Sequence, residues 1–122
     1  MTDATDKIDA LVVGGGPAGL AAAEALSAAG RRVVLAEAMP SVGRKFLMAG
    51  KSGLNITKDE PAEQFAGHIT PAAPMAPMLE AFGPQTMQDF ATGLGQAVFT
   101  GSSGRVFPAA MKASPLLRAW LG

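Results

Sequence analysis

Cysteine and tyrosine are absent from the 122 residues of this sequence, and histidine and tryptophan occur once each. Without cysteine there can be no disulfide, thiolate metal site or thiol nucleophile. The single histidine, His68, has only Glu63 as a nearby carboxylate in the sequence, so we expect a surface or packing role for it. No pair of residues has the spacing of a metal site or a catalytic triad. The sequence therefore assigns no metal ligand and no catalytic residue.

Charge is also scarce. Charged residues make up 16% of the chain, and ten basic residues balance ten acidic ones. A chain without net charge has no electrostatic reason to follow a nucleic-acid backbone or an anionic membrane, so we expect neither as a partner. The hydrophobic fraction of 48% instead predicts a globular protein with one modest core.

One apolar run, residues 10–30, is long enough to cross a bilayer. Three consecutive glycines, Pro17 and the charge of Glu24 interrupt it and argue against a membrane helix. The preceding residues "MTDATDKID" are acidic overall, whereas a secretory leader begins with positive charge. We therefore expect a cytoplasmic protein.

The same run reads as the start of an α/β fold. Residues 8–13 are rich in β-branched side chains and predict a strand buried on both faces. Residues 17–29 predict a helix with proline in its first turn and a glycine after its end, and residues 32–37 predict a second buried strand. Strand, helix and strand together form a βαβ unit.

The second half of the chain predicts smaller elements. Prolines divide residues 59–93 into short helices, the best of which begins at Pro84. Residues 96–101 and 104–108 predict a β-hairpin, and Ser114 begins a final helix. Two parallel strands are too few for a doubly wound sheet, so we expect an N-terminal part of a longer protein. Its expected division is a dinucleotide-binding unit at 1–58 and a helical and hairpin segment at 59–122.

A glycine-rich turn joins the first predicted strand to the helix and satisfies the pattern G-x-G-x-x-G. The first glycine permits the tight turn, the second lets a pyrophosphate approach the backbone, and the third lets the helix pack closely on the sheet. The phosphates then face the positive end of the helix dipole. The residues predicted to bind a cofactor here are Gly14, Gly15, Gly16, Pro17, Ala18 and Gly19.

An acidic residue follows at the spacing that dinucleotide sites use. Glu37 ends the second predicted strand, eighteen residues after Gly19. A carboxylate at this point can accept hydrogen bonds from the ribose hydroxyls of an adenosine, and it repels a 2′-phosphate. The pattern therefore predicts a dinucleotide other than NADP at this turn.

A second phosphate-binding pattern fails. Gly50-Lys51-Ser52 matches the last three residues of a P-loop, which also requires a glycine at position 45 and a strand leading into the loop. Position 45 is lysine, and the nearest predicted strand ends at Glu37. A triphosphate site is not expected here.

Three stretches carry a family resemblance. "VVGGGPAGLAAAEALSAAGRRVVLAE" resembles the fingerprint that binds the ADP half of FAD in two-dinucleotide-type flavoproteins. "GRKFLMAGKSGLNIT" resembles the "GRK…SGGGRCNVT" segment of a bacterial family that includes predicted NAD(P)/FAD-dependent oxidoreductases, aminoacetone-oxidase-like proteins and a bile-acid-intermediate reductase. "GSSGRVFPAAMKAS" resembles a later segment of the same family. The resemblance implies a Rossmann-like FAD-binding domain.

It also implies roles for particular residues. Arg44 or Lys45 would lie near the FAD, and Asn55 would lie close to its flavin end, on a loop that runs along the cofactor. The sequence departs from the family at residues 51–54, where much of the family has Gly-Gly-Arg-Cys. Arg105 belongs to the third stretch and either binds an anionic substrate or pairs within the hairpin.

These observations favour an FAD-dependent oxidoreductase that acts on a small-molecule substrate, with NAD(P)H as a candidate electron donor. An NAD-binding dehydrogenase module and a non-catalytic flavin- or nucleotide-binding protein remain open as alternatives. For the 122-residue chain alone we expect weak or absent FAD binding and no activity, because the segments that close over a flavin would lie beyond Gly122.

Overall fold

The computed structural model describes residues 7–51 and 53–122. The acidic N-terminal residues 1–6 and Ser52, the last residue of the P-loop match, lie outside the described residues. The chain forms two compact units, one up to Phe46 and one from Leu47 onwards. The division predicted from the sequence, after residue 58, is of another kind, because it separates the residues expected to hold the cofactor from the rest. It stays a prediction.

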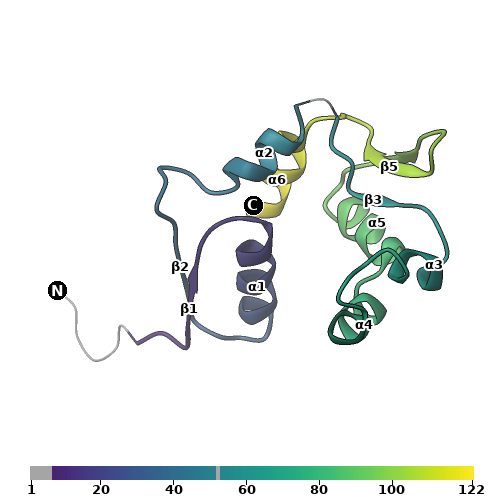
Figure 1. Ribbon diagram of the computed structural model, residues 1–122. Coiled ribbons are helices and arrows are strands. Elements are labelled where there is room, and N and C mark those ends of the chain that lie inside the picture. Colours follow the sequence, from purple (N-terminus) through teal and green to yellow (C-terminus); the bar gives the residue numbers. More distant parts are fainter. Residues whose placement is uncertain (1–6, 52) are drawn as a thin grey trace. The chain divides into compact units, whose positions relative to one another are not determined.

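The first compact unit contains the predicted βαβ arrangement (Figure 1). Strand β1 (Ala10–Val13) and strand β2 (Val33–Ala36) pair in parallel, with Ala10 opposite Val33 and Val13 opposite Ala36. Helix α1 (Pro17–Ala28) connects them and packs on both. The α/β fold and the parallel unit are therefore confirmed.

Helix α1 begins and ends where its sequence predicts. Pro17 occupies the first turn, where the missing N–H costs no hydrogen bond. At the other end Gly30 has a φ of 81°, its N–H donates to the carbonyl of Ser27, and the N–H of Arg31 donates to that of Leu26. These two bonds form a Schellman motif, which satisfies carbonyls that the helix itself leaves unpaired.

The burial of the parallel pair differs from the expectation. Both strands alternate between half-buried and exposed residues, and the side chains of Leu11 and Val13 are 58% and 81% exposed. Alternation arises because successive side chains point to opposite faces, and α1 is the described helix of this unit that packs on the pair. The prediction that the strands are buried on both faces is wrong for this structure.

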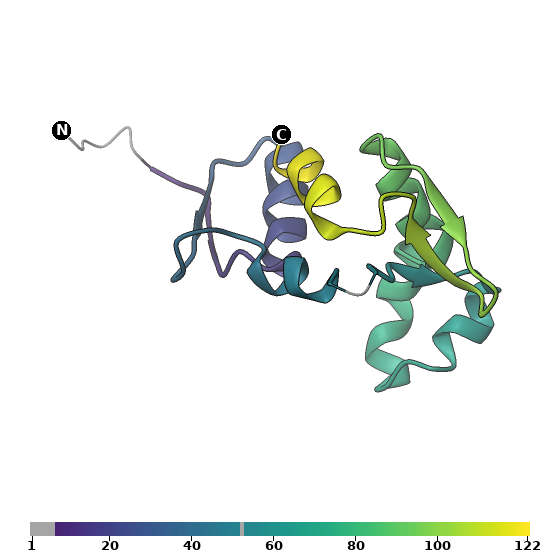
Figure 2. The ribbon, with the colours of Figure 1, turned by 90° about the horizontal axis from the view of Figure 1, so that it is seen from above.

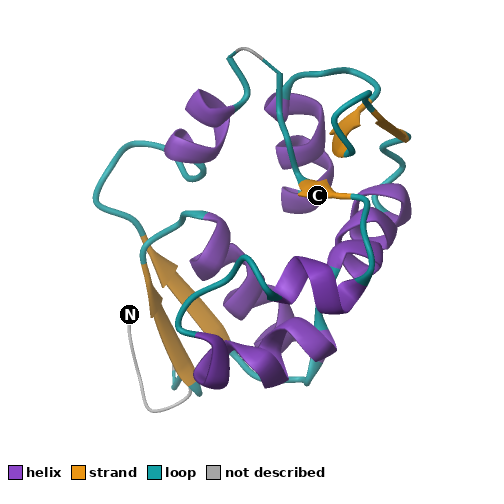
Figure 3. Ribbon diagram, turned by 45° about the vertical axis from the view of Figure 1, so that its right-hand side comes forward, coloured by secondary structure: helices purple, strands orange, loops and turns teal. Residues whose placement is uncertain are grey.

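The second compact unit contains a small antiparallel sheet (Figures 2 and 3). Its strand order is β3 (Thr57–Lys58), β5 (Arg105–Pro108) and β4 (Val98–Thr100). The β4–β5 pair is the predicted hairpin, and Phe99 lies opposite Phe107 with ring centroids 5.7 Å apart. Strand β3 was not predicted, because its partner β5 is distant in the sequence.

Five further helices follow α1 in the described part of the chain. They are α2 (Arg44–Ala49), α3 (Ala62–Ala66), α4 (Ala72–Ala81), α5 (Pro84–Gly93) and α6 (Ala113–Leu121). Of these, α5 contacts β3 and β4. Helix α5 begins at Pro84 as predicted, whereas α6 begins one residue before the predicted cap, Ser114. Helix α2 corrects the expectation of a continuous loop after Gly43, because its six residues, RKFLMA, are mostly strong helix formers.

The core of the second unit forms between these helices and strands. The buried apolar residues of this unit are Leu54, Ala91, Val106, Ala113, Leu116 and Leu117. Phe90 of α5 and Trp120 of α6 contact edge to face, with ring centroids 5.1 Å apart. Helix α6 thus carries two buried leucines, and its Trp120 contacts α5 through one aromatic pair.

Candidate functional site

The glycine turn between β1 and α1 has the geometry that its pattern predicts. Gly14 has a φ of 102°, a conformation that favours glycine, and its N–H donates to the carbonyl oxygen of Ala36 at 2.7 Å. A Cβ on Gly19 would overlap the carbonyl oxygen of Gly14, so α1 approaches the turn as closely as the pattern requires. A Cβ on Gly16 would meet no atom within 4 Å. Side-chain bulk at residue 16 would therefore enter open space beside the turn.

A cavity of about 210 Å³ lies at this turn. It brings together six of the predicted cofactor residues, and its full lining is Gly15, Gly16, Pro17, Glu37, Met39, Gly43, Arg44 and Lys45. The volume is below the 300–1,000 Å³ or so that is usual for complete small-molecule sites. It suits one portion of a dinucleotide, such as a ribose with its phosphates.

The remaining predicted residues lie outside this lining. Gly14, Ala18 and Gly19 belong to the turn and first helical turn but do not line the cavity. Asn55 belongs to the second compact unit, where it is exposed and precedes β3. The contact of Asn55 with the flavin end of a cofactor stays a prediction.

Two lining residues, Met39 and Gly43, were not among the predicted site residues. Gly43 is buried with a φ of 72°, and its N–H donates to the carbonyl oxygen of Gly15 at 2.7 Å. This bond holds the segment after β2 against the glycine turn. In the sequence, the only signal for this residue was that it is a glycine, since a backbone with positive φ favours glycine.

Glu37 is the main polar group of the cavity. Its Oε2 accepts a hydrogen bond from the N–H of Met39 at 2.9 Å, and its Oε1 accepts one from the N–H of Gly15 at 2.8 Å. These bonds hold the pKa of Glu37 below its ordinary value, Met39 having the larger effect, and the charge of Arg44 lowers the pKa slightly further. Each carboxylate oxygen keeps a second lone pair, which is available to a ribose hydroxyl.

Replacing Glu37 by glutamine should therefore destabilise the first unit in a pH-dependent way. The amide NH2 of glutamine would face a backbone N–H, so one of the two bonds is lost. Because the folded-state pKa is lowered, the contribution of the carboxylate is complete above the unfolded pKa of about 4.3 and is lost as the pH falls through the folded-state value. The gap in stability between wild type and Glu37→Gln should be widest near pH 7 and should narrow below pH 4 or so.

Amide hydrogen exchange in β1 and β2 at a series of pH values measures this gap. Glu63→Gln is the matched control, because it removes an exposed carboxylate on α3 in the other unit. A gap of constant size from neutral to acid pH would mean that Glu37 acts through its shape and not through its charge.

Two cations also line the cavity. Arg44 and Lys45 are the first residues of α2, and both are exposed. The cavity thus combines the backbone at the start of α1 with two positive side chains and one carboxylate. N–H groups and cations bind phosphate oxygens, while a carboxylate accepts hydrogen bonds from hydroxyls.

Two further features were sought in the described part of the chain, a metal site and a membrane-spanning helix. Residues 7–51 and 53–122 contain no group of three or more His, Asp or Glu side chains that could hold a metal ion. None of the described helices is long and apolar enough to span a membrane.

Comparison with known proteins gives one family. The model of the HI0933-like protein Rossmann domain matches residues 8–122, which is nearly the whole chain. A search of curated proteins finds no match. The family match and the parallel βαβ unit agree on a Rossmann-type fold.

Proposed function

The chain belongs to the HI0933-like family and contains its Rossmann-type nucleotide-binding domain, and we propose on that premise that it binds the ADP half of FAD. The reaction we propose is a flavin-dependent oxidation or reduction of a small molecule, with NAD(P)H as the electron donor and the cytoplasm as its setting. Bound flavin would supply the redox chemistry. The residues of this chain would bind and orient its adenosine diphosphate.

The observation that carries the proposal is the composition of the cavity at the glycine turn. Its lining places the N-terminus of α1, the carboxylate of Glu37 and the cations Arg44 and Lys45 around one space. Gly16 would let the phosphates approach the backbone at the start of α1, and the cations would pair with phosphate oxygens. Glu37 would accept hydrogen bonds from the ribose through its second lone pairs.

The proposal of FAD over NADP rests on Glu37. A 2′-phosphate placed beside this carboxylate would be repelled, and the backbone bonds of Glu37 favour its charged form. The preference for FAD over NAD rests on the resemblance of residues 12–37 and 43–57 to flavoprotein segments. An NAD-binding module remains the alternative that the test must separate.

ADP is the most direct probe, because the cavity suits this portion of the cofactor. We expect ADP to shift the amide NMR signals of residues 14–20 and 37–45 in a saturable way. ADP carrying an additional 2′-phosphate should bind at least tenfold or so more weakly, which corresponds to about 1.4 kcal/mol. No saturable shift with millimolar ADP, or equal binding of the 2′-phosphorylated form, would contradict the proposed site.

The redox proposal needs a second measurement. The full-length protein is mixed with FAD, NADH or NADPH is added, and bleaching of the visible flavin band is compared with the same mixture without protein. Faster bleaching with protein would support an oxidoreductase. NAD that binds more tightly than FAD in the same NMR titration would favour the NAD-binding alternative.

A further inference from the structure

A second cavity, of about 360 Å³, lies within the second compact unit and shares no residue with the cavity at the glycine turn. Its lining comes from β3, the segment around α3, the β4–β5 turn and β5, and consists of Lys58, Glu60, Phe65, His68, Ser103 and Arg105. One wall is aromatic and the others carry charged or polar groups. Neither the family match nor the proposed function assigns this cavity a role.

Glu60 is the unusual member of the lining. Its side chain is only 5% exposed, and both carboxylate oxygens are buried without a hydrogen-bond partner among residues 7–51 and 53–122. The nearest basic groups are Lys58 Nζ, 3.6 Å from Oε2, and His68 Nε2, 3.6 Å from Oε1. A buried carboxylate without hydrogen bonds is costly, so this residue is suited to a donor that enters from the cavity. His68 is 62% exposed, in keeping with the expected surface role, and folding brings it near Glu60 as well.

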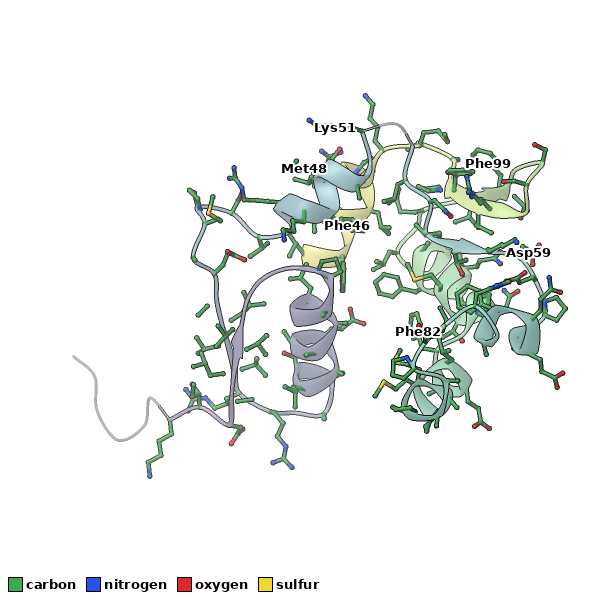
Figure 4. All side chains as sticks on the ribbon, viewed as in Figure 1. Phe46, Met48, Lys51, Asp59, Phe82 and Phe99 are labelled. Atoms are coloured by element: carbon green, nitrogen blue, oxygen red, sulfur yellow. The ribbon has the colours of Figure 1, made fainter. Side chains whose placement is uncertain are left out.

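The backbone fixes Glu60 at this place. The N–H of Asp59, whose side chain is labelled in Figure 4, donates to the carbonyl oxygen of Gly104 at 2.7 Å. Thr100 Oγ1 is 3.5 Å from Asp59 Oδ2, so a side-chain bond joins the same segment to the hairpin. The cavity is therefore built on paired strands.

A second, independent feature is a pair of like charges. Lys58 and Arg105 are direct cross-strand partners in the β3–β5 ladder. Like charges directly opposite each other destabilise a sheet. Both side chains line the cavity, so an anion there would relieve their repulsion.

We propose that this cavity binds a small hydroxylated carboxylate. The carboxylate of the ligand pairs with Arg105 and Lys58, its hydroxyl donates to Glu60, and its carbon chain lies against Phe65. A hydroxyl suits Glu60 better than an ammonium does, because Lys58 already places positive charge beside that carboxylate. This site uses no residue of the glycine turn, so the proposal can be tested independently of FAD binding.

The test compares lactate with propionate, which differ by one hydroxyl group. NMR titration of the labelled chain should show saturable shifts at residues 58–60, 68 and 103–105 with lactate. Lactate should bind about tenfold more tightly than propionate, because its hydroxyl bonds to a charged acceptor. Absence of saturable shifts at tens of millimolar, or equal affinity for the two acids, would overturn the proposal.

Two variants assign the parts of the site. Glu60→Met keeps a side chain of similar length without an acceptor, so the preference for lactate should disappear while propionate still binds. Arg105→Gln, on an exposed residue, should weaken both acids about tenfold. Lys112→Gln removes an exposed cation outside the cavity and should change neither affinity.

If Glu60→Met does not fold, the Arg105 variant and the two acids still test the proposal. Unchanged affinities in Arg105→Gln would refute the site.

Discussion

Gly19→Ala is expected to destabilise the first compact unit by about 1–3 kcal/mol, a typical cost of overpacking, and to remove ADP binding with it. The added Cβ would overlap the carbonyl oxygen of Gly14 and stand 3.4 Å from Val12 Cγ1. A flexible side chain could move away, but the carbonyl belongs to the backbone of the turn. Helix α1 must therefore shift from β1, or the turn must change its conformation.

Gly16→Ala is the matched control three residues earlier. Its Cβ meets no atom within 4 Å, and residue 16 has a φ of −79°, which any residue can adopt. Alanine is a poorer N-cap than glycine, but it also lowers the entropy of the unfolded chain, so stability should change by less than about 1 kcal/mol. ADP binding should nevertheless fall at least tenfold or so, since the Cβ would occupy space proposed for the phosphates.

Hydrogen exchange and ADP titration together separate the two effects. The N–H of Gly14, bonded to Ala36, should exchange faster in Gly19→Ala and unchanged in Gly16→Ala. Full ADP affinity in Gly16→Ala would move the phosphate site away from this turn. Normal exchange in Gly19→Ala would show that the close approach of α1 is not required.

The sequence predicted this part of the fold well because its signals are local. Pro17 and Gly30 mark the ends of α1, and each acts within a few residues of its own position. The hairpin of β4 and β5 is local in the same sense, since a short glycine-containing turn joins its strands. Signals of this kind can be interpreted from the sequence without knowledge of tertiary contacts.

The missed features depend on contacts that local patterns do not contain. Strand β3 consists of two residues and exists through pairing with β5, which begins 47 residues after the end of β3. The exposure of Val13 depends on which elements pack on the sheet, and not on the strand itself. Helix α2 is different, since its residues favoured a helix and the family resemblance led to a loop interpretation instead.

In the candidate site, too, local features could be predicted and features that depend on tertiary contacts could not. The glycine turn and Glu37 could be predicted because a strand, a turn and a helix at fixed spacing place them together. The hydrogen bonds from Gly15 and Met39 to Glu37 could not, because they depend on the path of the chain after β2. The cavity beside Glu60 was missed for a related reason, since its lining combines residues 58–68 with residues 103–105, which are distant in the sequence.

Leu116→Ala is expected to cost the second compact unit about 2–5 kcal/mol, the range for truncating a buried leucine. Leu116 is 1% exposed and lies on α6, whereas Leu121 on the same helix is 51% exposed. Leu121→Ala should therefore change stability by no more than about 0.5 kcal/mol. Both changes replace leucine by alanine in one helix, so the difference between them isolates the loss of buried contacts and the cavity left behind.

Urea unfolding followed by tryptophan fluorescence measures this difference, because Trp120 is the single tryptophan and contacts Phe90 of α5. The midpoint should fall clearly in Leu116→Ala, with a similar dependence of unfolding on urea in all three proteins. A difference below about 1 kcal/mol between the two variants would mean that α6 is not seated on the core. The buried face of α6 would then contribute little to the unit that also carries the Glu60 cavity, and stability there would have to come from the hairpin and α5.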